Sequence, residues 1–175
     1  MPGSYAPSTI ESIGDIHNGI FVESGESEYN IWGEKTQRYY FTVYNRVIIH
    51  ALWAEVTETI AGAVQTVFNY IQDTPSITLA ALSTVHASID TYVPGTRITY
   101  IGGSVAAAAI TLSTGAISYL PSTIPTILGV TPLAGVTSTG RIGFLSSVTD
   151  ATDGTLKFGC LYTPIDKGAY VSALL

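Results

Sequence analysis

The stretch that most constrains the fold runs from Tyr39 to Ile71 and is rich in Val, Ile, Thr and aromatic residues. Between Val47 and Ile60, apolar side chains occupy both alternating registers, which is typical of a strand buried on both faces. The same residues also lie near a helical stripe, so a helix is the alternative. The β-branched residues disfavour that helix, and we predict two long strands, Val47–Ile60 and Ala63–Gln72, with a bend at Gly62.

Shorter strand-like runs, separated by turn sequences, follow this stretch. Val93-Pro94-Gly95-Thr96 has Pro and Gly at the two central positions where a type II turn prefers them. Leu79–Ala87 fits either a short helix capped by Thr78 or another strand. The run Thr155–Thr163 alternates most clearly. Its apolar face carries Leu156, Phe158, Cys160 and Tyr162. Many short strands with frequent turns predict an all-β fold, a single antiparallel β-sandwich or small barrel.

Residues 1–35 differ from the predicted β-domain, residues 36–175, because they combine charged side chains with closely spaced glycines. We predict an extended N-terminal arm that reaches onto a neighbouring subunit and adds a strand to its sheet. The alternative is an arm that folds back on its own domain. The candidate interface residues of the arm are apolar side chains that are costly to leave in water: Ile20, Phe21, Tyr29, Ile31 and Trp32.

The composition points to a buried interface. Charged residues make up 11% of the 175-residue chain, and the mean hydropathy is +0.35. Since about 25% is usual in soluble domains, the chain fits either a membrane protein or a subunit that buries surface in an assembly. The longest stretch without a charged residue, Ile98–Gly140, is interrupted by Gly and Pro and offers no apolar span of about 20 residues. We therefore predict a homo-oligomeric assembly subunit, with a trimer as the expected state and no membrane partner.

Charge and cysteine usage exclude further classes. The net charge is −6, and Lys and Arg are scattered singly, which argues against a nucleic-acid partner. Cys160 is the single cysteine, so no internal disulfide is possible. Its place on an apolar strand face indicates a small core residue rather than a nucleophile. The first residues lack the basic and apolar regions of a secretory signal, which predicts synthesis in a cytoplasm.

The segment Gly14–Gly19 contains Asp15 and His17 and resembles the GD-x-H metal-binding segment of metallophosphoesterases. The further Gly-Asp and Gly-Asn-His motifs of that family do not occur, so we expect a Gly-bounded loop. No G-x-S-x-G nucleophile elbow occurs either. His50 and His86 are expected to be a buried, hydrogen-bonded side chain and a surface side chain. We predict that the protein is not an enzyme and has no catalytic residue, metal site or cofactor.

The chain has eleven tyrosines, and exposed aromatic faces can stack on sugars. Tyr39, Tyr40 and Tyr44 lie in a predicted strand, where aromatic side chains normally pack across to neighbouring strands. Packing is therefore the favoured role of these tyrosines, and glycan binding is the alternative.

Four pieces of the chain resemble small structural proteins of tailed bacteriophages. These pieces are NRVIIHALWAEVTETI, PGTRITYIGG, GRIGFLSS and LKFGCLYTPIDKGAYVSA. The resemblance implies a β-rich virion subunit without catalysis, a capsid decoration (cement) protein that stabilises the shell. Its partner would be the major capsid protein or another virion subunit, in a virion assembled in the host cytoplasm. The alternative function is a tail or fibre component that binds a host-surface glycan through exposed tyrosines.

Overall fold

The computed structural model describes residues 19–28, 37–62, 65–82, 89–101, 110–112, 126–130, 136–146 and 153–174. These residues form strands and turns and no helix. The strands are β1 (Ile20–Glu28), β2 (Gln37–Tyr44), β3 (Val47–Ala61), β4 (Thr66–Thr74), β5 (Thr78–Ala81), β6 (Arg97–Ile101), β7 (Ile110–Leu112), β8 (Thr126–Leu128), β9 (Thr139–Ser146), β10 (Asp153–Pro164) and β11 (Tyr170–Ala173).

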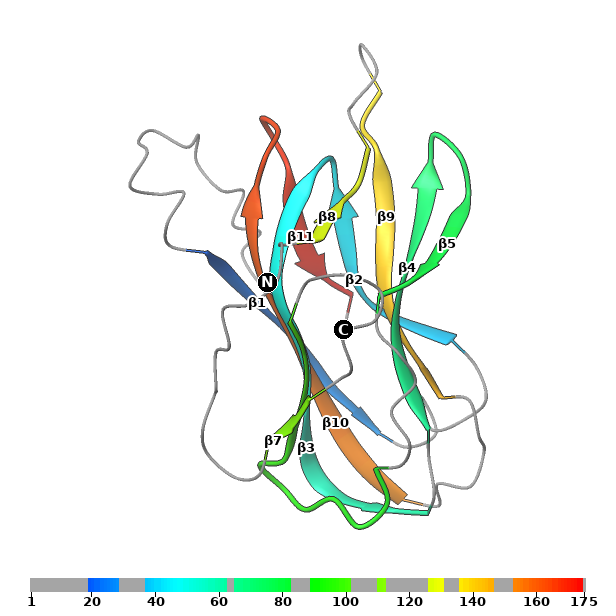
Figure 1. Ribbon diagram of the computed structural model, residues 1–175, viewed down its shortest axis with the longest axis vertical. Helices are drawn as coiled ribbons and strands as arrows, with labels where there is room; N and C mark the ends of the chain where they lie inside the picture. Colours follow the sequence, from blue (N-terminus) through cyan, green and yellow to red (C-terminus); the bar gives the residue numbers. More distant parts are fainter. Residues whose placement is uncertain are drawn as a thin grey trace.

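Two antiparallel sheets pack face to face (Figure 1). The first sheet has the order β1-β10-β3-β6-β7, and β8 also pairs with β3. The second sheet has the order β11-β2-β9-β4-β5. The sheets are not closed into a barrel, so of the two predicted architectures the chain adopts the β-sandwich. The predicted all-β antiparallel fold is confirmed.

The two long strands predicted from the central stretch are confirmed as β3 and β4. They do not pair with each other, because β3 lies in the first sheet and β4 in the second. Gly62 follows the end of β3 with a positive φ of 98°, a conformation that favours glycine. The predicted bend at Gly62 therefore lies where the chain leaves one sheet for the other.

The structure also tests the predictions for two shorter segments of the chain. In the turn before β6, Gly95 has a φ of 86° and the Thr96 N–H donates to the Val93 carbonyl at 3.1 Å, as a type II turn requires. The segment that fitted a helix or a strand begins as the strand β5, which pairs with β4. A strand there uses the backbone groups of β4 that would otherwise lie at a sheet edge. Residues 83–87 of that segment are outside the described residues.

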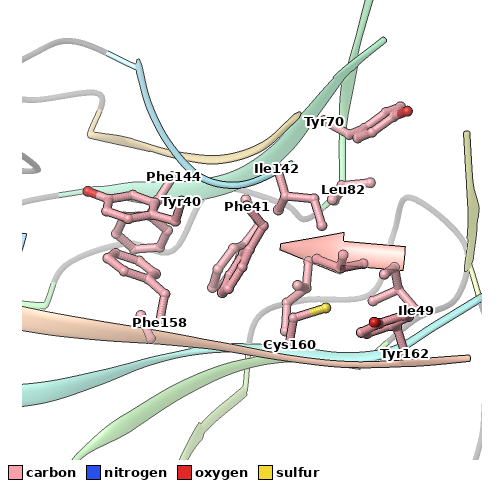
Figure 2. Packing of buried hydrophobic residues seen from close by; sticks show 14 of the residues in the cluster. Tyr40, Phe41, Ile49, Tyr70, Leu82, Ile142, Phe144, Phe158, Cys160 and Tyr162 are labelled. Carbon is pink, nitrogen blue, oxygen red and sulfur yellow. The ribbon is translucent and has the colours of Figure 1, made fainter. Parts of the chain in front are cut away.

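Aromatic rings join the two sheets through the core (Figure 2). Tyr40 of β2 stacks on Phe158 of β10 with ring centroids 3.7 Å apart. Phe144 of β9 meets Phe158 edge to face at 5.1 Å and Phe68 of β4 at 4.9 Å. Edge-to-face and offset pairs of this kind add to the stabilisation that burial alone provides. The predicted apolar face of β10 is confirmed, because all of its members are buried in the core: Leu156, Phe158, Cys160 and Tyr162.

Strand β1 occupies the edge of the first sheet and pairs with β10 of the same chain. A bulge interrupts the pairing between Glu23 and Glu26, and there the Ser24 Oγ accepts the Phe158 N–H at 3.0 Å. For residues 20–28, the structure thus shows the alternative in which the predicted arm folds back on its own domain. Strand pairing with β10 supplies the backbone hydrogen bonds that the predicted pairing with a neighbouring subunit would have provided.

Candidate functional site

The outer face of the first sheet carries a group of apolar side chains that the core does not cover. Along β3, burial alternates from Val47 to Ile49 and is then shifted by a bulge opposite Leu161 and Tyr162. His50 is the extra residue of this bulge. After it, Leu52 and Ala54 belong to the core, whereas Trp53 and Glu55 lie on the outer face, each half-buried. The bulge therefore places Trp53 on the solvent side of the sheet.

Phe21 of β1 and Trp53 form a pair of nearly parallel rings on this face, with centroids 5.2 Å apart and planes 6° apart. Gly159 of β10 pairs in register with Trp53, and a Cβ at Gly159 would overlap the indole ring. The indole thus lies directly on the β10 backbone. Leu161 is the cross-strand partner of Phe21. We call Phe21, Trp53, Gly159 and Leu161 the aromatic platform.

A row of alternating charges borders the platform. Glu26, Lys157, Glu55 and Arg97 are cross-strand partners along β1, β10, β3 and β6, one residue pair after another. The Arg97 Nε donates to the Glu55 Oε2 at 2.6 Å, and the Lys157 Nζ donates to the Glu23 Oε2 at 2.6 Å. These two ion pairs give the border of the platform polar donors and acceptors. With Glu26 included, the border has a net charge of −1.

His50 lies on the same face, near the other border of the platform. Its Nε2 lies 2.8 Å from the Thr163 Oγ1, and its ring is half-buried. Burial lowers the pKa of His50 below 6.5, because partial desolvation disfavours the imidazolium. The hydrogen bond agrees with the prediction for His50, although the ring is less buried than expected. His86 is outside the described residues.

A second apolar surface lies at one end of the sandwich, the upper end in Figure 1. Its members are large hydrophobic side chains in or beside the turns at this end. They are Ile77 after β4, Ile127 in β8, Val130 and Val136 between β8 and β9, and Ile165 after β10, and all are more than a third exposed. Hydrogen bonds join these turns, including Asn45 N–H to Ser138 O at 2.9 Å and Ile165 N–H to Arg46 O at 2.9 Å. We call these five side chains the apolar end.

A bidentate ion pair stands beside the apolar end. Arg46, before β3, donates from its Nη2 to the Asp166 Oδ1 at 2.7 Å and from its Nε to the Asp166 Oδ2 at 3.0 Å. The Arg46 backbone N–H donates to the same carboxylate. These hydrogen bonds lower the pKa of Asp166 below its usual value of 3.8. The pair fastens the β10–β11 turn to the β2–β3 turn.

The outer face of the second sheet holds its aromatic rings differently. Arg141 of β9 lies over the Tyr39 ring, 4.1 Å from its centroid. It also forms a bidentate ion pair with Asp73 of β4, in which both nitrogen-to-oxygen distances are 2.8 Å. Tyr44 stacks on Tyr170 of β11 with centroids 4.3 Å apart. Each half-buried ring on this face therefore already has a partner on one side.

Tyr40 does not belong to either outer face. It is 1% exposed, its hydroxyl lies 3.3 Å from the Ser27 Oγ, and burial raises its pKa to about 12. Of the tyrosines considered for glycan binding, Tyr40 is thus a core residue and Tyr39 and Tyr44 pack against neighbouring side chains. The favoured packing role of these tyrosines is confirmed.

The residues predicted for the interface of the arm separate in the structure. Ile20 packs against the core, whereas Phe21 is 52% exposed on the aromatic platform. Tyr29, Ile31 and Trp32 lie outside the described residues. Sequence reasoning found Phe21 but missed its partner Trp53, because strict alternation assigns Trp53 to the face of Val47 and Ile49. A polar residue within the apolar run, His50, was the available signal for the bulge.

The residues considered as a nucleophile or as metal ligands lie either in the core or outside the described residues. Cys160 is fully buried, and burial raises the pKa of its thiol well above the usual range, so its thiolate is strongly disfavoured. Asp15 and His17 are outside the described residues. Within the part of the chain that the structure describes, no group of three or more His, Cys, Asp or Glu residues could hold a metal ion.

Comparisons with known proteins identify no relative. No protein-family model matches the chain, and neither a curated protein nor a solved structure matches it. Among the described residues, there is also no helix with the length and apolar character needed to cross a membrane.

Proposed function

We propose that the protein is a non-enzymatic structural subunit of a viral particle, a capsid decoration protein that binds the outside of the shell. The observation that carries the proposal is the apolar end, where five large hydrophobic side chains are exposed at the same end of the sandwich. Large exposed apolar surfaces mark sites that a partner covers. The resemblance of four sequence pieces to bacteriophage structural proteins supports a shell protein as that partner.

The size of the apolar end supports a multivalent subunit. Burying one such side chain fully is worth about 1.5–3 kcal/mol, so the exposed parts of the five supply about 4–8 kcal/mol. Association itself costs about 4–15 kcal/mol. One apolar end would therefore bind weakly, and several copies joined in one oligomer would bind much more tightly through avidity. A homo-oligomer, with a trimer as the proposed state, fits this requirement on a repeating shell surface.

The surface charge favours the outer side of the shell. The chain has a net charge of −6, and packaged nucleic acid would repel an acidic protein on the inner side. The alternative function, a tail or fibre component, differs in copy number. Hundreds of copies per particle are expected for a decoration protein, and only a few for a component at one vertex.

Quantitative mass spectrometry of purified particles, assembled in cells that express the chain, tests the proposal. We expect hundreds of copies per particle for the natural chain, and at least about a tenfold loss for the double variant Ile77→Asp, Val136→Asp, because a charge cannot be buried cheaply in an apolar contact. Val93→Asp is the control, since Val93 is about as exposed as Val136 but lies in the turn before β6. Absence of the natural chain from the particles, or equal losses for both variants, would contradict the proposal.

A further inference from the structure

We propose that the aromatic platform is a binding site for an uncharged sugar, which stacks the apolar face of its ring on the open side of Phe21, the ring that itself stacks on Trp53. This inference concerns a different surface from the apolar end and does not depend on the proposed shell partner. Phe21 stacks on Trp53, and the pair forms an apolar surface on the sheet together with Leu161. Pyranose rings present a comparable face of C–H groups, with hydroxyls around the edge.

The platform is organised before any ligand arrives. Trp53 lies on the β10 backbone at Gly159, where a side chain would overlap the indole, and Phe21 is parallel to it within 6°. Both residues belong to strands that pair with β10 in register. Binding would thus immobilise little that is not already fixed, which reduces the entropic cost of association. At 52% exposure, Phe21 also offers open ring surface.

The border of the platform decides the charge of the ligand. The carboxylates of Glu23 and Glu55 are paired with Lys157 and Arg97, so no free cation beside the rings attracts an anion. The remaining carboxylate of the border, Glu26, lies opposite Lys157, one cross-strand pair further from the rings than Glu23. Nucleic acid bases could stack on the rings, but their phosphates would approach an acidic chain whose local cations are already paired. A neutral ligand needs no free charged partner and is not repelled by the acidic chain.

The same border provides the hydrogen-bonding pattern that hydroxyls need. A hydroxyl is both donor and acceptor. Glu23 and Glu55 each use Oε2 in their ion pair, and within the described residues their Oε1 atoms accept no hydrogen bond. The Arg97 guanidinium uses only Nε for Glu55 in that same part of the chain. Acceptors and donors therefore flank the rings, where the hydroxyls of a stacked sugar would lie.

The size of the platform favours a small ligand over a protein partner. It spans three neighbouring strands, which lie about 4.8 Å apart, and so extends about 10 Å across the sheet. A stable protein interface needs about 800 Å² from each partner, several times the area of such a patch. One or two sugar rings match it better than a second copy of the chain does.

The test uses the full chain and ligand-observed NMR with cellohexaose, maltohexaose, mannohexaose and N-acetylchitohexaose, and with sorbitol as a hydroxyl-rich ligand that has no ring. We expect saturable binding of at least one oligosaccharide and none of sorbitol. Phe21→Ala should raise the Kd at least about fivefold, because an aromatic contact is lost. Tyr44→Ala is the matched control, since it removes a stacked ring from the outer face of the second sheet and should leave the Kd unchanged.

Glu23→Gln separates a sugar site from a merely apolar surface. It keeps the shape of the side chain but unbalances the paired charges and weakens an acceptor, so the Kd should rise. Phe21 is exposed, so its variant should fold even if a Trp53 variant does not. Three results would overturn the proposal: no oligosaccharide bound, a Kd unaffected by Phe21→Ala, or self-association that Phe21→Ala abolishes in the absence of sugar binding. The last would assign the platform to a contact between copies.

Discussion

The outer faces of the two sheets each hold an aromatic ring against a glycine, but the surroundings of the two rings differ. On each face, an aromatic ring lies against a glycine of a central strand: Trp53 against Gly159 on the first sheet, and Tyr39 against Gly143 on the second. On the second sheet, Arg141 covers the Tyr39 ring and is itself fixed by Asp73. On the first sheet, the neighbouring ring is another apolar one, and the charged side chains pair with one another beside it instead of covering it.

This difference shows that the number of aromatic residues is a poor indicator of a binding face. Tyrosines are more numerous on the second sheet, yet Tyr39 and Tyr44 each have a partner within the chain. Tyr39, which lies against Gly143 and under Arg141, has little surface left for a ligand. The first sheet has fewer rings but leaves Phe21 half exposed. What distinguishes the two faces is where their cations lie.

The largest expected effect comes from the core that both faces share. Phe158→Ala removes the ring that stacks on Tyr40 and meets Phe144, and so loosens the contact between the sheets. We expect the free energy of unfolding to fall by about 3–5 kcal/mol, as for other buried aromatic truncations. Urea denaturation measures it. Phe21→Ala on the exposed platform is the control and should cost less than about 1 kcal/mol; similar losses for both variants would contradict this account of the core.

Placing an alanine at each of the two glycines compares the faces directly. At Gly143, a Cβ would lie 2.6 Å from the Arg38 carbonyl oxygen, which belongs to the paired backbone of β2 and cannot move freely. At Gly159, the three atoms nearest to the Cβ would all belong to the indole of Trp53, a side chain that can turn away from the sheet. We expect Gly143→Ala to destabilise by about 1–3 kcal/mol and Gly159→Ala by less.

Gly159→Ala should instead disturb the platform, because the displaced indole can no longer lie parallel to Phe21. Tryptophan fluorescence should shift toward longer wavelength as the ring moves into water, while Gly143→Ala should leave it unchanged. If Gly159→Ala destabilises more than Gly143→Ala and leaves the emission spectrum unaltered, the ring does not lie on the glycine as described.

Arg141, which covers the Tyr39 ring on the second face, is expected to contribute less to the stability of the protein. Arg141→Gln removes the bidentate pair with Asp73 and the cation above Tyr39. Since both charged side chains are partly exposed, the loss should be about 1 kcal/mol. Asp73→Asn keeps the cation over the ring and should cost less than Arg141→Gln. Thermal denaturation of both variants, at low and high salt, checks this ranking. Equal losses of stability would mean that the contact between Arg141 and the Tyr39 ring contributes nothing.

Much of this architecture follows from the sequence, and the exceptions have local causes. The apolar residues in both registers from Val47 to Ile60 predicted a strand, and β3 is that strand. Alternation failed at His50, because one bulged residue moves Trp53 to the opposite face. The sequence also could not show that Phe21 meets Trp53, since their contact depends on β10 lying between two strands that are distant in the chain.

The arm shows a second limit of sequence reasoning. Charge and glycines in residues 1–35 predicted a segment unlike the core, but they could not show whether it pairs with the sheet of a neighbour or with a sheet of its own chain. The described part, β1, pairs with β10 of the same chain. Ser24 decides locally how the segment fits, since its Oγ replaces the backbone acceptor at the bulge in β1. Such a replacement depends on the strand register, which composition does not reveal.

The smallest expected effect is a pH dependence at the border of the platform, where His50 is half-buried. Its pKa in the folded chain lies below 6.5, its value when unfolded, so the unfolded state binds a proton more readily. The stability associated with neutral His50 is therefore fully present above pH 6.5 and is lost as the pH falls toward the folded pKa. His50→Gln should flatten this part of the stability curve, measured as the urea midpoint between about pH 7.5 and pH 5. Asp166→Asn is the control, because the pKa of Asp166 is lowered below 3.8 and its contribution is lost only in stronger acid. A slope between pH 7.5 and pH 5 that His50→Gln leaves intact would show that another group titrates there and that desolvation at the platform border does not control His50.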